Sequence, residues 1–132
     1  MRAKEHWEKA ARLEASGAAG LDGDDDYELI IWSCVQGGAQ LANAILCARG
    51  ITADDEDQIH SDLPELKREL PPDVKEMLAL LKSIENLGPR FVRGIEPMQP
   101  GVVKNCLEAY ARIKAMAQQS LQVQEKTNAR QA

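Results

Sequence analysis

The chain has 132 residues, of which 44% are hydrophobic and 28% are charged. This length corresponds to a single domain, and this composition excludes wholesale disorder and a collagen-like repeat. The 16 Lys and Arg against 21 Asp and Glu give a net charge of −5. No global positive field therefore attracts a phosphate backbone, which excludes a dedicated nonspecific DNA-binding protein.

The charge is unevenly distributed along the chain. Residues 1–62 contain 5 Lys and Arg against 13 Asp and Glu, whereas residues 63–132 contain 11 against 8. An anionic partner is therefore expected to bind the second half. The sequence starts with a charged amphipathic segment, and no 18 apolar residues follow one another, so we expect a cytoplasmic protein that does not enter a membrane.

The first half predicts two helices. Residues 2–16 have a helical apolar spacing with Trp7 as the core anchor, and residues 25–49 form a second helix that ends at Gly50. The second helix is apolar around most of its circumference, which predicts a central position in the core. Gly37 and Gly38 in its middle favour the close approach of a neighbouring backbone.

The second half predicts a short helix over 63–70, a core-facing helix over 72–87, a Pro- and Gly-containing connection over 89–100 and a last helix from 101 to about 121. No segment alternates with a period of two. The expected fold is therefore all-α, an up-and-down four-helix bundle with an additional short helix, in a single domain over 1–121. Residues 122–132 are expected to be a polar, frayed tail.

The predicted core consists of large apolar side chains from all four main helices, and we expect the three cysteines to be buried free thiols. The large side chains are Trp7, Ile30, Ile31, Leu41, Ile45, Leu78, Leu81, Ile84, Leu107, Tyr110 and Ile113, and the thiols are Cys34, Cys47 and Cys106.

The sequence offers few residues that could act in catalysis or bind a metal. The two histidines, His6 and His60, have no partner His at helical spacing and no thiol at ligand spacing, so no metal site is expected. No P-loop motif occurs, and no catalytic residue and no cofactor are assigned.

The most suggestive local feature is the segment 89–94, in which Arg90 and Arg93 flank Phe91. Two guanidinium groups beside an aromatic ring are a means of gripping a phosphate or a single-stranded nucleic acid, so these three residues are the candidate ligand-binding site. In the alternative interpretation, Phe91 closes the end of the bundle and the two arginines pair with carboxylates.

Three stretches together resemble the HEPN superfamily of helical bundles: LCARG at 46–50, HSDLPELKREL at 60–70 and PRFVRG at 89–94. The similarity covers roughly residues 25–94. It implies an up-and-down bundle, frequently dimeric and often encoded beside a nucleotidyltransferase in toxin and antitoxin pairs. Active members are RNases with an Arg and a His four to six residues apart in the C-terminal half, but the last histidine of this chain is His60, and no Arg lies four to seven positions before it. The resemblance therefore implies a non-catalytic accessory member.

Three functions remain open from the sequence. The first is a non-catalytic HEPN-like binding domain, a homodimer that acts with a protein such as a nucleotidyltransferase, or with a nucleotide or RNA. The second is an atypical RNase that uses His60 with Arg90 or Arg93. The third is a purely structural or regulatory adaptor whose acidic first half binds a basic protein surface.

Overall fold

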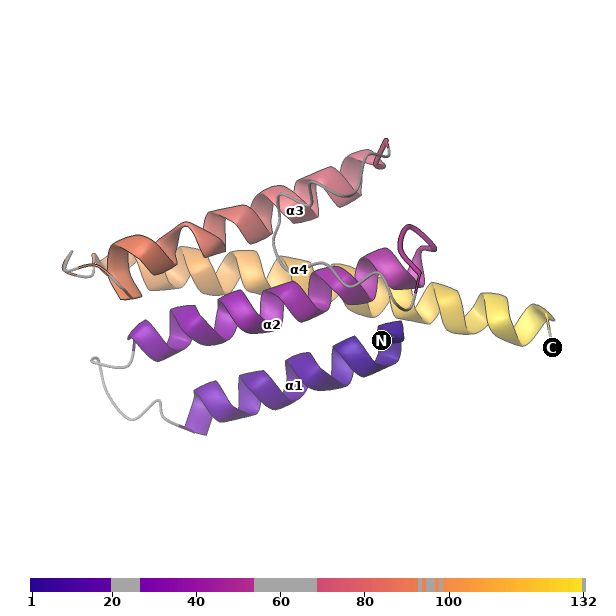
Figure 1. Cartoon of the computed structure of the whole chain (residues 1–132), viewed down its shortest axis with the longest axis horizontal. Helices are drawn as coiled ribbons and strands as arrows, with labels where there is room; N and C mark the ends of the chain where they lie inside the picture. Colours follow the sequence, from indigo (N-terminus) through magenta and orange to yellow (C-terminus); the bar gives the residue numbers. More distant parts are fainter. Residues whose placement is uncertain (20–26, 54–68, 93, 95–96, 98, 132) are drawn as a thin grey trace.

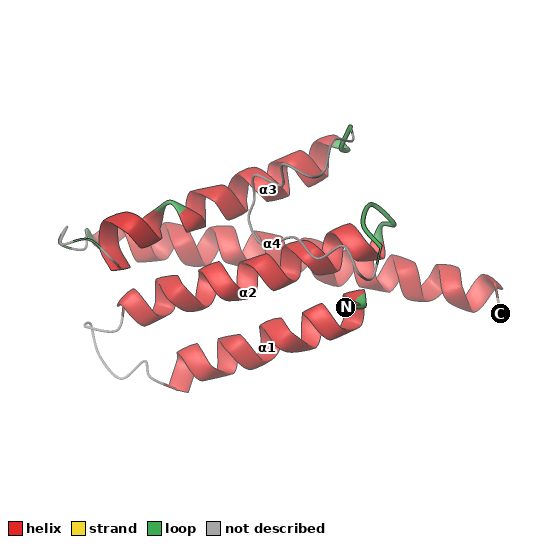
Figure 2. Cartoon of the chain, in the orientation of Figure 1, coloured by secondary structure: helices red, strands yellow, loops and turns green. Residues whose placement is uncertain are grey.

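A computed structural model describes residues 1–19, 27–53, 69–92, 94, 97 and 99–131. The regular elements in this part of the chain are all helical, which confirms the predicted all-α class (Figure 2). They are the helices α1 (Ala3–Ala19), α2 (Tyr27–Ala48), α3 (Pro72–Glu85) and α4 (Pro100–Gln131), together with the short π-helix η1 (Gly88–Val92).

Helix α2 is the central element, as its apolar circumference predicts. It packs against α1, α3, α4 and η1. Figure 1 shows α1 and α3 on either side of α2 and α4 behind it, with consecutive helices running in opposite directions, so that α2 and α4 run the same way. Among the described residues, α2 is the one helix long and apolar enough to cross a membrane, and 61% of that stretch is buried inside the structure.

One hydrophobic core joins the helices, and most of the predicted core residues belong to it. Seven of them are buried: Ile31, Leu41, Ile45, Leu81, Ile84, Tyr110 and Ile113. Trp7, Ile30 and Leu78 are half-buried and pack against its margin. The prediction for Leu107 is wrong, because this side chain is 46% exposed. The face of α4 that enters the core instead begins at the preceding residue, Cys106, and continues through Tyr110 and Ile113.

The two adjacent glycines of α2 accommodate side chains rather than a neighbouring backbone, so the predicted reason for them is wrong. A Cβ atom on Gly37 would lie 2.8 Å from Tyr110 Oη, and one on Gly38 would lie 3.0 Å from Leu81 Cδ1. Gly37 therefore admits a ring from α4, and Gly38 admits a side chain from α3. Both neighbours belong to the same chain, so these glycines serve helix packing within the molecule.

Several helix ends differ from the predicted ones. Helix α1 continues through Gly17 to Ala19, and α4 continues to Gln131, so residues 122–131, expected as a frayed tail, are helical. Gly50 ends α2 as predicted, since its φ is +71° and its N–H donates to the Cys47 carbonyl at 3.1 Å. The expected short helix over 63–70 falls almost entirely outside the described residues.

Candidate functional site

The predicted ligand-binding segment lies at the end of α3, where η1 folds back onto α2. Phe91 is 1% exposed and belongs to the core, as the structural alternative predicts, so its ring offers no open face to a base. The Arg90 guanidinium lies 4.8 Å from the centre of that ring, a cation–π contact. Arg93 and His60 lie outside the described residues. A ligand-binding role for the two arginines stays a prediction.

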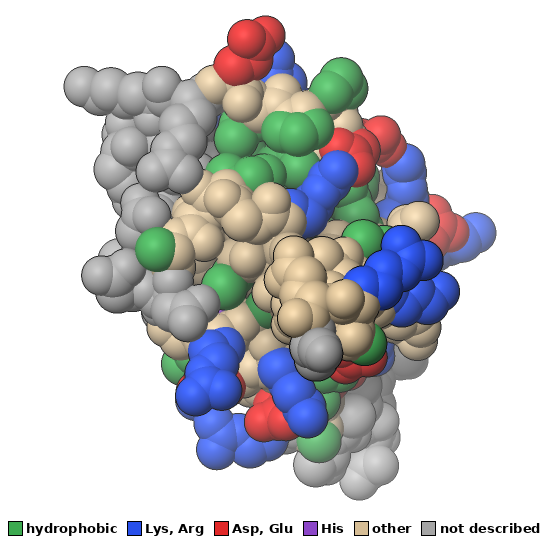
Figure 3. All heavy atoms as spheres, turned by 90° about the vertical axis from the view of Figure 1, so that its right-hand side faces the viewer, with side chains coloured by type: hydrophobic (Ala, Val, Ile, Leu, Met, Phe, Trp, Pro, Cys, Tyr) green, Lys and Arg blue, Asp and Glu red, His purple; other side chains and the backbone are tan. Residues whose placement is uncertain are grey.

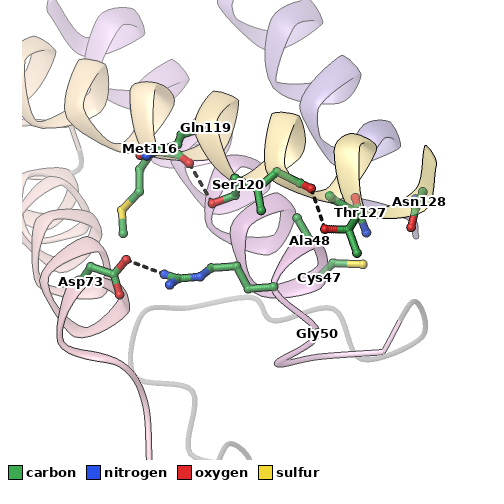
Figure 4. Close-up of a pocket in the computed structure, with 12 residues that line it drawn as sticks. Cys47, Ala48, Gly50, Asp73, Met116, Gln119, Ser120, Thr127 and Asn128 are labelled. Atoms are coloured by element: carbon green, nitrogen blue, oxygen red, sulfur yellow. Dashed lines mark hydrogen bonds and ion pairs between the residues drawn. The ribbon is translucent and has the colours of Figure 1, made fainter. Parts of the chain in front are cut away.

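A groove with a volume of about 570 Å³ opens where α2 ends (Figure 4). One wall is the last turn of α2 with the residues that follow it, joined by the first turn of α3. The other wall is the C-terminal half of α4. The lining residues are Cys47, Ala48, Arg49, Gly50, Asp73, Met116, Gln119, Ser120, Val123, Gln124, Thr127 and Asn128.

The groove exists because α4 is longer than the helix beside it. Gly37 packs against Tyr110, which sets α2 and α4 in a parallel register about 73 positions apart. In this register Ala48, the last residue of α2, lies level with residue 121, whereas α4 continues to Gln131. Residues 122–131, named here the α4 overhang, therefore extend about 15 Å beyond α2. Figure 1 shows α4 projecting past the ends of the other helices.

The α4 wall of the groove is an uncharged stripe of Met116, Ser120, Val123 and Thr127, spaced by four, three and four residues. The Ser120 hydroxyl donates to the Met116 carbonyl and the Thr127 hydroxyl donates to the Val123 carbonyl, each at 2.9 Å. Both hydroxyl protons are therefore used within the helix. Val123 is 58% exposed, an apolar side chain on an otherwise polar segment. This spacing is the one that helix–helix seams use.

The opposite wall is held by an ion pair between α2 and α3. Arg49 Nη1 donates to Asp73 Oδ2 at 2.6 Å, and Asp73 Oδ1 accepts the Val74 N–H at 2.9 Å. The carboxylate lies in the first turn of α3 and the guanidinium follows the end of α2, so each charge is favourable to the dipole of its helix. The pair therefore joins the start of α3 to the residue that follows α2.

Charged side chains surround the groove rather than line its α4 wall. Figure 3 looks onto the end of the molecule from which α4 projects, and Lys and Arg side chains gather along the lower and right margins of this view. The α4 overhang itself contains Lys126 and Arg130, both exposed, and one carboxylate, Glu125. This end of the molecule therefore presents a groove with an uncharged α4 wall and a wall that contains the Arg49–Asp73 ion pair, with Lys and Arg side chains elsewhere on the same end.

The groove residues were not predicted from the sequence. The difference in length between α2 and α4 could have indicated the groove. To see this difference, the end of α4 must be known, and the sequence pattern predicts that end ten residues too early. Within the described part of the chain, no three His, Cys, Asp or Glu side chains are grouped so that they could hold a metal ion.

Comparison with family models, curated proteins and solved structures gives no match. The HEPN resemblance therefore stays a prediction.

Proposed function

We propose that the chain is a non-catalytic binding module, an HEPN-like up-and-down four-helix bundle that forms a homodimer through the α4 overhang. The observation that carries this proposal is that the same helix, α4, forms one wall of the groove and also projects as the overhang. A second copy therefore brings a projecting helix to every groove.

The overhang of a single copy has little tertiary packing. Most helical stability in proteins comes from a packed face, so this ten-residue extension of α4 would gain stability if a surface covered it. In a single copy, Val123 is 58% exposed and the residues after Gln124 are exposed as well. A partner surface along this segment would supply the missing packing.

The overhang and the groove also match in length. The groove follows α4 from Met116 to Asn128, a length of about 18 Å, which is close to the length of the overhang. Two overhangs related by a two-fold axis would lie antiparallel, each covering the groove of the other, which is the isologous contact typical of homodimers. Small uncharged residues on the stripe, such as Ser120 and Thr127, allow two helices to approach closely.

The dimer is proposed as the platform on which a further partner binds, either a protein such as a nucleotidyltransferase or a nucleotide or RNA. The Lys and Arg side chains at this end of the molecule favour an anionic surface on that partner. The RNase alternative depends on His60, and RNA cleavage that survives the substitution His60→Ala would eliminate it.

The test is static light scattering of the full chain over a range of micromolar concentrations, with a matched pair of variants. Val123 and Leu107 are both exposed apolar residues of α4, but Val123 lines the groove and Leu107 does not. We expect twice the mass of 14.5 kDa for the wild type and for Leu107→Glu, and the monomer mass for Val123→Glu.

Two outcomes would contradict the proposal. A wild type that remains monomeric at all concentrations removes the dimer altogether. A dimer that Leu107→Glu dissociates and Val123→Glu leaves intact places the interface elsewhere on the molecule.

A further inference from the structure

Two buried thiols face each other across the seam between α2 and α4. The contact between Gly37 and Tyr110 fixes the register of these parallel helices. One turn earlier on each helix are Cys34 and Cys106, which are 5% and 2% exposed and belong to the same core cluster. Leu41 and Lys114, one turn later, line one small cavity, so the register continues along the seam.

The two thiols also interact across this seam. Each lies on the face of its helix that enters the shared core cluster. The interaction between the two thiols lowers the pKa of Cys106, while the same interaction together with burial raises the pKa of Cys34. Cys106 is therefore the thiol that ionises first.

We propose that Cys34 and Cys106 are a redox pair that forms an intramolecular disulfide between α2 and α4 when the protein meets a hydroperoxide. The Cys106 thiolate attacks a peroxide oxygen and the O–O bond breaks, which leaves a sulfenic acid on Cys106 and, after protonation, one molecule of water. The Cys34 sulfur then attacks the Cys106 sulfur, the S–O bond breaks, and the hydroxyl group leaves as a second water. Two thiols and one hydrogen peroxide thus give one disulfide and two waters.

The third cysteine provides the matched control. Cys47 lies 13 residues after Cys34 on the same helix, about 20 Å away along its axis, and its thiol contacts the Met1 carbonyl at 3.9 Å. The prediction that Cys47 is buried is wrong: this residue is half-buried at the groove and is therefore more accessible than either member of the pair. A reaction governed by exposure alone would select Cys47, whereas a reaction governed by proximity selects the pair.

The experiment treats the reduced full chain with hydrogen peroxide and then maps peptides by mass spectrometry without reduction. We expect a Cys34–Cys106 linked peptide that has lost two hydrogen masses, and a melting temperature about 10 °C higher, because the bond closes a long loop. Cys47→Ala should preserve both results, and Cys34→Ala should abolish both.

The linked peptide is measured on the wild type, so the result does not depend on whether a variant folds. Recovery of both thiols unmodified, or of linkages that involve Cys47 or join two molecules while the pair stays reduced, would overturn the proposal.

Discussion

Gly37 offers the sharpest test of how α2 and α4 pack. In the substitution Gly37→Ala the new methyl group would lie 2.8 Å from Tyr110 Oη, and 3.2 Å and 3.3 Å from two ring carbons. A buried aromatic ring cannot give way as a flexible chain end can, so overpacking should cost about 1–3 kcal/mol. The gain in helix propensity offsets about 1 kcal/mol of this. We expect a net loss of about 1 kcal/mol in the free energy of unfolding, measured by urea denaturation.

The neighbouring Gly38→Ala is the matched control, because it brings the same gain in propensity on the same helix. Its methyl group would lie 3.0 Å from Leu81 Cδ1, the end of a flexible side chain that can shift. Gly38→Ala should therefore be more stable than Gly37→Ala by about 1–2 kcal/mol.

Removing the hydroxyl should relieve the clash. In a Tyr110→Phe background the 2.8 Å contact disappears, and Gly37→Ala should cost about 1 kcal/mol less than in the wild type. Equal stabilities for the two glycine variants, or a double-mutant coupling energy near zero, would refute the packing described for Tyr110.

The remaining predictions concern the core and one titrating group. Ile113→Ala should lower the free energy of unfolding by about 2–5 kcal/mol, because Ile113 is buried, and Leu107→Ala by less than about 0.5 kcal/mol, because Leu107 is exposed. Similar losses for the two variants in urea denaturation would show that α4 is rotated about its axis relative to this structure. Phe91→Ala should cost about 3–5 kcal/mol by the same assay, and an unchanged midpoint would remove Phe91 from the core. Burial, and then the nearby Glu14 carboxylate, raise the pKa of Tyr110 above its ordinary 10.0. As the pH rises, the Tyr110 hydroxyl therefore loses its proton in the unfolded chain before it does so in the folded chain. The free energy of unfolding should fall as the pH rises beyond about 10, and it should fall less steeply in Tyr110→Phe. Parallel profiles of stability against pH for the wild type and Tyr110→Phe would contradict this.

The sequence predicts the helices well where the apolar pattern is long. The apolar circumference of α2 predicts its central place, because a helix without a polar face must be covered on all sides. The prediction fails for Leu107. Because α4 is largely polar, its few apolar residues can be assigned to either of two adjacent helix faces, and the sequence does not decide which face enters the core. Glycine is also ambiguous: Gly17 does not end α1, whereas Gly50 ends α2 through its positive φ.

The candidate site was less predictable than the fold. In the sequence, Phe91 could be either an exposed ring that stacks on a base or a core residue. The structure shows that it is a core residue, because the π-helix buries its side chain. The groove depends on where α4 ends, and polar residues such as Gln122 and Gln124 resemble a frayed tail in sequence although they continue the helix. The residue at which a helix ends depends on a few weak local interactions. A groove that forms because two helices differ in length is therefore difficult to predict from the sequence.

Hydrogen exchange of the α4 overhang as a function of protein concentration tests whether the overhang forms the dimer interface. If the overhang of one copy covers the groove of the other, amide protection over residues 122–131 should rise with concentration, while protection of the buried part of α4 around Ile113 stays constant. Exchange over 122–131 that is equally fast in dilute and concentrated solution would contradict the dimer proposed here.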